Sequence, residues 1–168
     1  NAGILRDRTM AKMSVEDWQA VLNVNLTGVF LCCKYGLEIM RDGGAIVGLG
    51  SISAFHGSFG QANYAAAKLG IVGLSKSIAL DMQKFGVRSN AVAPFAWTRM
   101  VGTIPEVTPE DKRRVEGLKK LVPEKIAPFV VALLVPGGAG ALMTLRLGDA
   151  PPPFDLADLS GKRVSSDA

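Results

Sequence analysis

The sequence has very little of the residue types that carry metal, disulfide and hydrolytic chemistry. It contains one histidine, His56, and two cysteines, Cys32 and Cys33. A single histidine argues against a zinc hydrolase and leaves a Ser/His/Asp triad only if His56 is its base. The cysteines are adjacent in a stretch of helical character, where neighbouring side chains diverge. We therefore expect reduced thiols in or near the core and no metal site.

Long apolar runs and strong charge are also lacking. No stretch of about 18 apolar residues is free of polar interruption, and no basic start followed by an apolar block marks a signal peptide. We therefore expect a cytoplasmic protein without a membrane partner. The net charge of +4 over 168 residues is modest, and its densest basic stretch is Lys112–Arg114. This distribution predicts no nucleic-acid partner.

With 48% hydrophobic residues, the chain can bury the core of one globular domain. Its pattern predicts, in order, a helix from Ser14 to Met40, a strand from Ala45 to Gly50 buried on both faces, a helix from Gln61 to Phe85 and a strand from Val87 to Ala93. Ser14 begins a capping-box-like sequence, and Gly86 ends the second helix. Helices that alternate with strands form crossovers in a parallel sheet, so we expect a doubly wound α/β fold.

The pattern weakens beyond the second strand. Thr108 begins a predicted short helix that ends at about Leu121, and residues 122–134 predict a further apolar helical piece. The composition then becomes rich in proline and glycine. We expect a catalytic portion over residues 1–134 and an atypical, partly disordered segment over residues 135–168, with poor order in its last ~15 residues.

Tyr64 and Lys68 are the first candidates for chemistry. Four residues apart on a helix, their side chains lie on one face, one turn from each other. A phenol has a pKa of about 10 in water, and a nearby ammonium group favours the phenolate by roughly 1–3 pKa units. The pair is therefore a candidate general acid and base, although the same spacing also occurs on solvated helix faces.

Ser51 and Asn25 are polar residues in predicted apolar surroundings. Ser51 follows the first predicted strand, where it could donate a hydrogen bond to a substrate oxygen or serve as a loop or cap serine. Asn25 interrupts the apolar stripe of the first helix. A buried amide needs hydrogen-bond partners, so Asn25 either satisfies a break in the backbone or holds a water molecule. The stripe consists of Trp18, Leu22, Val29 and Cys33.

Five motifs, in order and spacing, resemble the motif set of the short-chain dehydrogenase/reductase family over about residues 1–134. They are Asn1-Ala2-Gly3, Asn25 in its Val-Asn-Leu-Thr-Gly context, Ser51, Tyr64 to Lys68, and Asn90 to Pro94. The resemblance implies a Rossmann-like fold and an oxidoreductase that uses NAD or NADP to interconvert a secondary alcohol and a carbonyl.

The resemblance also implies a role for each matching residue. Tyr64 is the expected general acid and base, Lys68 lowers its pKa and holds the nicotinamide ribose, and Ser51 orients the reacting oxygen. Asn25 is expected to support a proton-relay water. The expected cofactor-binding residues are Asn1, Ala2, Gly3, Tyr64, Lys68, Pro94 and Thr98.

Within the family, three segments are most similar to (3R)-hydroxyacyl-CoA dehydrogenase domains of the multifunctional enzyme type 2 kind and their bacterial relatives. These segments are Asn1 to Arg8, Gly57 to Tyr64 and Ala93 to Met100. The similarity implies a 3-hydroxyacyl-CoA as the small-molecule substrate, and another secondary alcohol or a 3-oxoacyl thioester of a carrier protein stays open as an alternative. It also implies a homodimer or homotetramer that assembles through the two long helices.

The family's opening strand, Gly-rich turn and pyrophosphate-binding helix do not precede Asn1. The resemblance therefore implies a fragment whose sheet is incomplete at its amino-terminal side. Two functions stay open. The chain is either the catalytic part of the oxidoreductase, or a non-catalytic fragment that cannot bind the dinucleotide and has a structural or associating role only.

Overall fold

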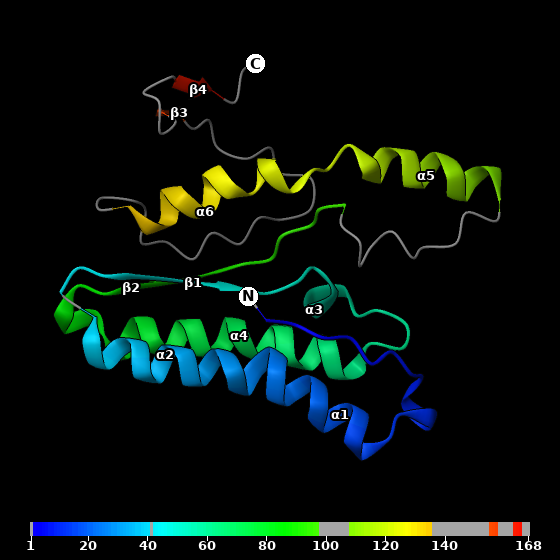
Figure 1. Cartoon of the computed structure of the whole chain (residues 1–168), viewed down its shortest axis with the longest axis horizontal. Coiled ribbons are helices and arrows are strands. Elements are labelled where there is room, and N and C mark those ends of the chain that lie inside the picture. Colours follow the sequence, from blue (N-terminus) through cyan, green and yellow to red (C-terminus); the bar gives the residue numbers. More distant parts are fainter. Residues whose placement is uncertain (1, 41, 98–107, 136–154, 158–162, 166–168) are drawn as a thin grey trace.

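The computed structural model describes residues 2–40, 42–97, 108–135, 155–157 and 163–165 (Figure 1). The elements follow in this order: η1 (Met10–Lys12), α1 (Val15–Leu22), η2 (Asn23–Thr27), α2 (Gly28–Ile39), β1 (Ala45–Leu49), α3 (Ser53–His56), α4 (Ala62–Asp81), η3 (Gln83–Phe85), β2 (Arg88–Val92), α5 (Pro109–Lys119), η5 (Pro123–Lys125), α6 (Ala127–Leu134), β3 (Asp155–Ala157) and β4 (Arg163–Ser165). Asn1 and Thr98 lie outside the described residues.

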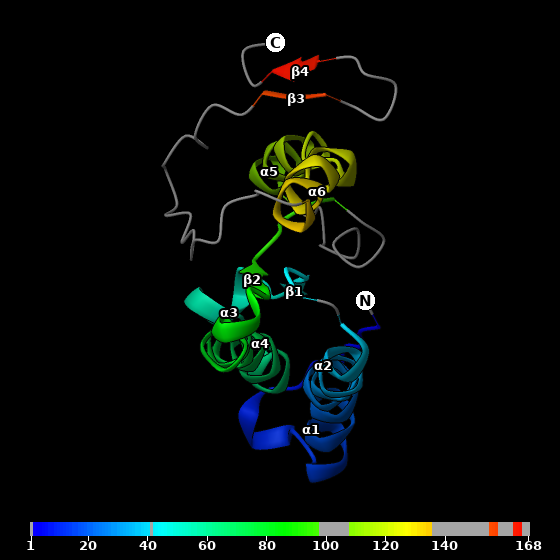
Figure 2. The ribbon, with the colours of Figure 1, turned by 90° about the vertical axis from the view of Figure 1, so that its left-hand side faces the viewer.

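The centre of the fold is a two-stranded parallel sheet. β1 pairs with β2 in a register that joins Ala45 to Arg88 and Leu49 to Val92. α4 connects the two strands and packs on one face of the sheet, beside the helix formed by α1, η2 and α2, while α6 contacts β1 from the other face (Figure 2). The expected α/β architecture is confirmed as part of a Rossmann-like fold.

The first long helix is continuous from Val15 to Ile39, as expected. The Ser14 hydroxyl oxygen accepts a 3.0 Å hydrogen bond from the Asp17 amide and caps its start. A π-helical turn, η2, interrupts the α-helical pattern. By length and composition alone, this 25-residue helix is long and apolar enough to cross a membrane. One face of it nevertheless packs against α4, where Val21 and Asn25 are fully buried.

α4 forms the other half of the core. Its buried stripe consists of Asn63, Ala67, Ile71, Ser75 and Ile78. Two glycines let its neighbours approach closely. A Cβ at Gly48 of β1 would lie 2.7 Å from Ile71 Cγ2, and a Cβ at Gly70 would lie 2.7 Å from Leu26 Cδ2 of η2. Both distances are shorter than van der Waals contact, so a larger residue at either position would force the facing side chain or the helix itself to shift.

Two expectations about burial are wrong. β1 is not buried on both faces, because only Gly48 in it is buried and its other residues are half-buried. The described part of the sheet has two strands and therefore leaves β1 less covered than a central strand of a larger sheet. Cys32 is exposed on α2 instead of lying in or near the core. Cys33 is half-buried, and burial raises the pKa of its thiol.

The segments that follow β2 confirm the predicted helices with shorter bounds, because α5 ends at Lys119 and α6 begins at Ala127. Arg88 of β2 holds the end of α6. Its guanidinium donates hydrogen bonds of 2.7 Å to the Leu133 carbonyl and 2.8 Å to the Val135 carbonyl. A cation at this end also offsets the negative end of the helix dipole. Beyond α6, β3 and β4 form an antiparallel pair that the sequence pattern did not predict.

Candidate active site

Tyr64 and Lys68 lie one turn apart near the start of α4, as the spacing predicted. The Lys68 Nζ atom lies 5.7 Å from the centroid of the Tyr64 ring. The same Nζ donates a 2.8 Å hydrogen bond to the Leu49 carbonyl at the end of β1. Burial lowers the pKa of Lys68. The structure therefore holds an amine of reduced basicity beside a phenol, at the carboxyl end of a parallel strand.

Gly50 connects this pair to the end of β2. Its amide donates a 2.7 Å hydrogen bond to the Val92 carbonyl. A Cβ at Gly50 would lie 3.4 Å from that carbonyl oxygen and 3.6 Å from the Lys68 carbonyl oxygen. The absence of a side chain lets the backbones of β1, β2 and α4 meet at this point. Pro94 follows at the same end of β2, where it is half-buried.

Ser51 is half-buried in the turn between β1 and α3. Its hydroxyl oxygen accepts a 3.3 Å hydrogen bond from the Ser53 amide, and its carbonyl accepts one from Ala54. These bonds make Ser51 the residue that begins the α3 turn. A serine hydroxyl is both a donor and an acceptor, and among the described residues Ser51 Oγ only accepts, so its proton can still be donated. Ser51 can therefore serve as a cap serine and still donate a hydrogen bond to a substrate oxygen.

Asn25 is fully buried within η2. Its Oδ1 accepts a 2.8 Å hydrogen bond from the Ile4 amide, and its Nδ2 donates a 2.9 Å hydrogen bond to the Ile4 carbonyl. The bonds to Ile4 match the first alternative, a satisfied backbone segment, and the second alternative, a bound water molecule, stays a prediction. One Nδ2 hydrogen and one Oδ1 lone pair have capacity for another partner. A π-turn is also a frequent feature of functional sites.

Asn63, which the sequence pattern did not single out, is also fully buried. Its Nδ2 donates hydrogen bonds of 3.0 Å to the Arg6 carbonyl and 3.3 Å to the Asp17 carbonyl. Its Oδ1 accepts a 2.7 Å hydrogen bond from the Tyr64 amide. A usable signal was present, because Asn63 is a polar residue on the buried stripe of its helix, as Asn25 is on the other.

The segment from Ala2 to Thr9 is fixed from several sides. Besides the two asparagines, Gly60 and Gln61 hold it, since the Arg8 amide donates to the Gly60 carbonyl at 2.8 Å and Gln61 Nε2 donates to Asp7 Oδ2 at 3.0 Å. A Cβ at Gly3 would lie 3.7 Å from Asn25 Oδ1. The structure therefore brings the expected cofactor-binding residue Gly3 next to the expected catalytic residue Asn25, with Ala2 adjacent in the chain.

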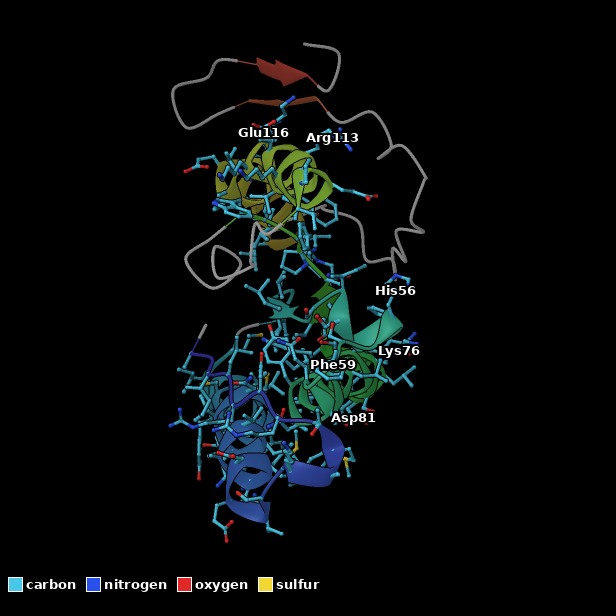
Figure 3. All side chains as sticks on the ribbon, turned by 90° about the vertical axis from the view of Figure 1, so that its right-hand side faces the viewer. His56, Phe59, Lys76, Asp81, Arg113 and Glu116 are labelled. Atoms are coloured by element: carbon cyan, nitrogen blue, oxygen red, sulfur yellow. The ribbon has the colours of Figure 1, made fainter. Side chains whose placement is uncertain are left out.

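The candidate base His56 and the basic residue Arg113 of α5 point outward. His56 on α3 is exposed, as is the neighbouring loop residue Phe59, which is 92% exposed (Figure 3). Arg113 is exposed on α5, as expected for a solvated helix face. An apolar hollow of about 150 Å³ lies at the start of α1 and is lined by Met10, Met13, Ser14, Val15 and Trp18, without Tyr64 or Lys68.

The amino-acid sequence of this chain is similar to those of known reductases and dehydrogenases. A family model described as enoyl-(acyl carrier protein) reductase matches residues 1–144. The chain is 44% identical to acetoacetyl-CoA reductase of Synechocystis over 81% of its length, and 48% identical to a 3-oxoacyl-[acyl-carrier-protein] reductase of the same organism over 56%. It is 44% identical to mouse peroxisomal multifunctional enzyme type 2 over 79% of its length.

The chain spans 58%, 39% and 17%, respectively, of these three relatives. The family expected from the five motifs is confirmed, and the narrower resemblance to multifunctional enzyme type 2 is found among the relatives as well. Members of this family are oxidoreductases that use NAD or NADP. With the parallel sheet, the Tyr64 and Lys68 pair and these matches together, the chain belongs to the short-chain dehydrogenase/reductase family.

Proposed function

We propose that residues 1–134 carry the catalytic part of an oxidoreductase that interconverts a secondary alcohol and a carbonyl with NAD or NADP. The observation that carries this proposal is the Lys68 ammonium group, held by the Leu49 carbonyl at 5.7 Å from the Tyr64 ring. We further propose a 3-hydroxyacyl or 3-oxoacyl thioester, such as an acyl-CoA, as the substrate. The names of the acetoacetyl-CoA and 3-oxoacyl reductases support this substrate class.

The donors at the end of β1 suit a nicotinamide cofactor. An ammonium group has three donors, and Lys68 uses one of them on the Leu49 carbonyl. The others can bind the hydroxyls of the nicotinamide ribose. Ligands of open α/β sheets bind outside the carboxyl ends of the strands, where Pro94 follows β2. When bound, the nicotinamide supplies or accepts the hydride.

The residues of the chain handle the proton. In the reducing direction, the Tyr64 hydroxyl donates a proton to the substrate oxygen, and in the oxidising direction the phenolate accepts it. The Ser51 hydroxyl donates a hydrogen bond to the same oxygen and stabilises the charge that develops there. The Lys68 ammonium group stabilises the phenolate electrostatically. The remaining hydrogen-bonding capacity of Asn25 serves a water molecule that relays the proton.

Two measurements test the proposal. Fluorescence titration of this chain with NADH and then NADPH is expected to give saturable binding. Absence of binding would favour the alternative, a fragment with a structural or associating role only. In a chimera that joins the preceding residues of the Synechocystis acetoacetyl-CoA reductase to Asn1, Tyr64→Phe should lower turnover by about 10²-fold or more and leave cofactor affinity nearly intact.

The matched control in the same chimera is Tyr35→Phe. Tyr35 is 58% exposed on α2, so its phenol has no part in the proposed proton transfer. Its loss should leave turnover unchanged. Near-normal turnover of Tyr64→Phe would contradict the mechanism.

We also infer that the protein assembles as a homodimer or homotetramer through α2 and α4. Both helices expose large apolar side chains, namely Phe30, Leu31, Tyr35, Ile39, Leu69 and Leu80. Apolar patches of this kind mark interaction surfaces. Light scattering after size-exclusion chromatography would give the mass, and a monomer at all concentrations would contradict the inference. A cytoplasmic location stays a prediction, because the mouse relative is named as peroxisomal.

A further inference from the structure

We propose that Asn63 is a positioning residue, which fixes Tyr64 in the orientation that proton transfer requires. The inference rests on the proposed function, because it gives Asn63 a role through the acid and base of that reaction. Asn63 itself touches neither the Tyr64 phenol nor Lys68 in the contacts described above. It acts through the backbone of Tyr64 and through the two elements that it ties to the start of α4.

Asn63 replaces the usual helix cap. The first amide groups of an α-helix have no partner within the helix, and the side chain of the N-cap residue usually accepts one of them. Gln61 is the N-cap residue of α4, yet its side chain makes no capping hydrogen bond and binds Asp7 instead. The Tyr64 amide donates a 2.7 Å hydrogen bond to Asn63 Oδ1 instead. The catalytic tyrosine is therefore the residue whose backbone depends on Asn63.

The amide group of Asn63 joins three separate parts of the chain. Its Nδ2 donates to the Arg6 carbonyl in the amino-terminal segment and to the Asp17 carbonyl in α1, while its Oδ1 faces α4. Reversing the amide would place its NH₂ group against the Tyr64 amide and its oxygen against two carbonyls. The orientation is thus determined by its partners. Movement of the first turn of α4 relative to α1 would break these bonds in a buried place.

The chain offers a matched control in Asn90, which is also buried but is on β2. Its Nδ2 has no hydrogen-bond partner among the described residues. Replacement of Asn90 by alanine removes a buried amide of the same size without touching Tyr64. It therefore reports what general loss of packing does to the readouts below.

The first experiment uses this chain, without cofactor or turnover. The protein has two tyrosines, Tyr35 and Tyr64, so tyrosine labelled with ¹³C at the ring carbon Cζ alone gives two signals, assigned with Tyr64→Phe. In Asn63→Ala, the Tyr64 signal is expected to move or broaden while the Tyr35 signal stays in place. Asn90→Ala is expected to move neither. An unmoved Tyr64 signal in folded Asn63→Ala would overturn the proposal, and if that variant does not fold, Asn63→Ser is judged by the same criterion.

The second experiment measures kinetics in the chimera described above. Asn63→Ala is expected to lower kcat by about 10- to 100-fold, since a misplacement of about 1 Å costs on this scale. The KM for the substrate and the affinity for NADH or NADPH should stay close to the native values. If kcat fell only in proportion to the fraction of folded protein, the proposal would be overturned. If the chimera with native Asn63 is inactive, the proposed function fails, and the tyrosine signals still decide whether Asn63 positions Tyr64.

Discussion

The Lys68 ammonium group donates a 2.8 Å hydrogen bond to the Leu49 carbonyl, although the two residues are 19 positions apart in the sequence. This bond ties the face of α4 that carries Tyr64 and Lys68 to the last residue of β1. It also determines where the amine lies, 5.7 Å from the centroid of the Tyr64 ring. The spacing of Tyr64 and Lys68 alone would allow many other lysine rotamers. The hydrogen bond to the Leu49 carbonyl fixes one of them.

The buried amine makes stability depend on pH. Burial lowers the pKa of Lys68 below its ordinary value of 10.5. Between the lowered value and 10.5, the unfolded chain binds more protons than the folded chain, so the free energy of unfolding contributed by Lys68 rises with pH in that window. Lys68→Met lacks this contribution. Any advantage of the methionine variant over the native chain should therefore shrink as the pH increases.

Urea unfolding of the native chain and Lys68→Met at a series of alkaline pH values measures this difference. Lys76→Met is the matched control for removal of one positive charge, because Lys76 is exposed on the same helix (Figure 3). A stability difference between native and Lys68→Met that is constant across the window would contradict the prediction.

Gly48→Ala should weaken the contact between β1 and α4. The new Cβ would lie 2.7 Å from Ile71 Cγ2 and 3.0 Å from Ser75 Oγ. Overpacking of this kind costs about 1–3 kcal/mol. Gly73→Ala is the control on α4, since nothing lies within 4 Å of its added Cβ. A mid-helix alanine should raise stability there by about 0.5–1 kcal/mol. Denaturant unfolding measures whether each change lowers or raises the free energy of unfolding. Equal effects of the two changes would contradict the close packing of Gly48 against α4.

Asn25→Ala should release the amino-terminal segment from η2. It removes the bonds to the Ile4 amide and carbonyl, each of which contributes about 0.5–1.5 kcal/mol of stability. Hydrogen exchange at the Ile4 amide is expected to accelerate in this variant. Asn23→Ala, at an exposed position of the same π-turn, should leave the exchange at Ile4 unchanged. Native-like protection of Ile4 in Asn25→Ala would show that other contacts hold the segment.

Arg88→Ala should loosen the end of α6. The guanidinium bonds to the Leu133 and Val135 carbonyls are charge-assisted, and such bonds contribute about 1.5–3 kcal/mol. Arg88→Lys keeps the charge but loses the two-pronged geometry, so its loss should be intermediate. Hydrogen exchange along Ala127–Leu134 and denaturant unfolding measure both effects. Equal stability of the lysine and native proteins would mean that charge alone accounts for the interaction.

The sequence was sufficient to predict most elements of the fold and the shared helix face of Tyr64 and Lys68, whereas the roles of the site residues stay predictions. The Ser14 cap, the two long helices and the two parallel strands follow from capping, hydrophobic periodicity and turn residues, all of which act locally. Burial was harder to predict. Cys32 is exposed on α2, and β1 pairs with β2 alone in the described part of the chain, so the sequence pattern overstated the burial of both.

Asn63 was missed because α4 is apolar on nearly all sides, which hides its buried stripe among similar residues. Asn63 is, like Asn25, a polar side chain at a buried helix position. Asn63 can be recognised as buried only when the inward face of α4 is known. Gly48 and Gly70 help to set that face, because they let β1 and η2 approach the helix closely.

The sequence by itself determined the order of the elements, the spacing that places Tyr64 and Lys68 on one helix face, and the motif set of the family. These properties depend on residues close together in the chain. The tertiary structure alone decided the partners: Leu49 for Lys68, Ile4 for Asn25, and Arg6 and Asp17 for Asn63. Such hydrogen bonds join residues far apart in sequence, and packing of α4 against β1 and α1 brings them within reach.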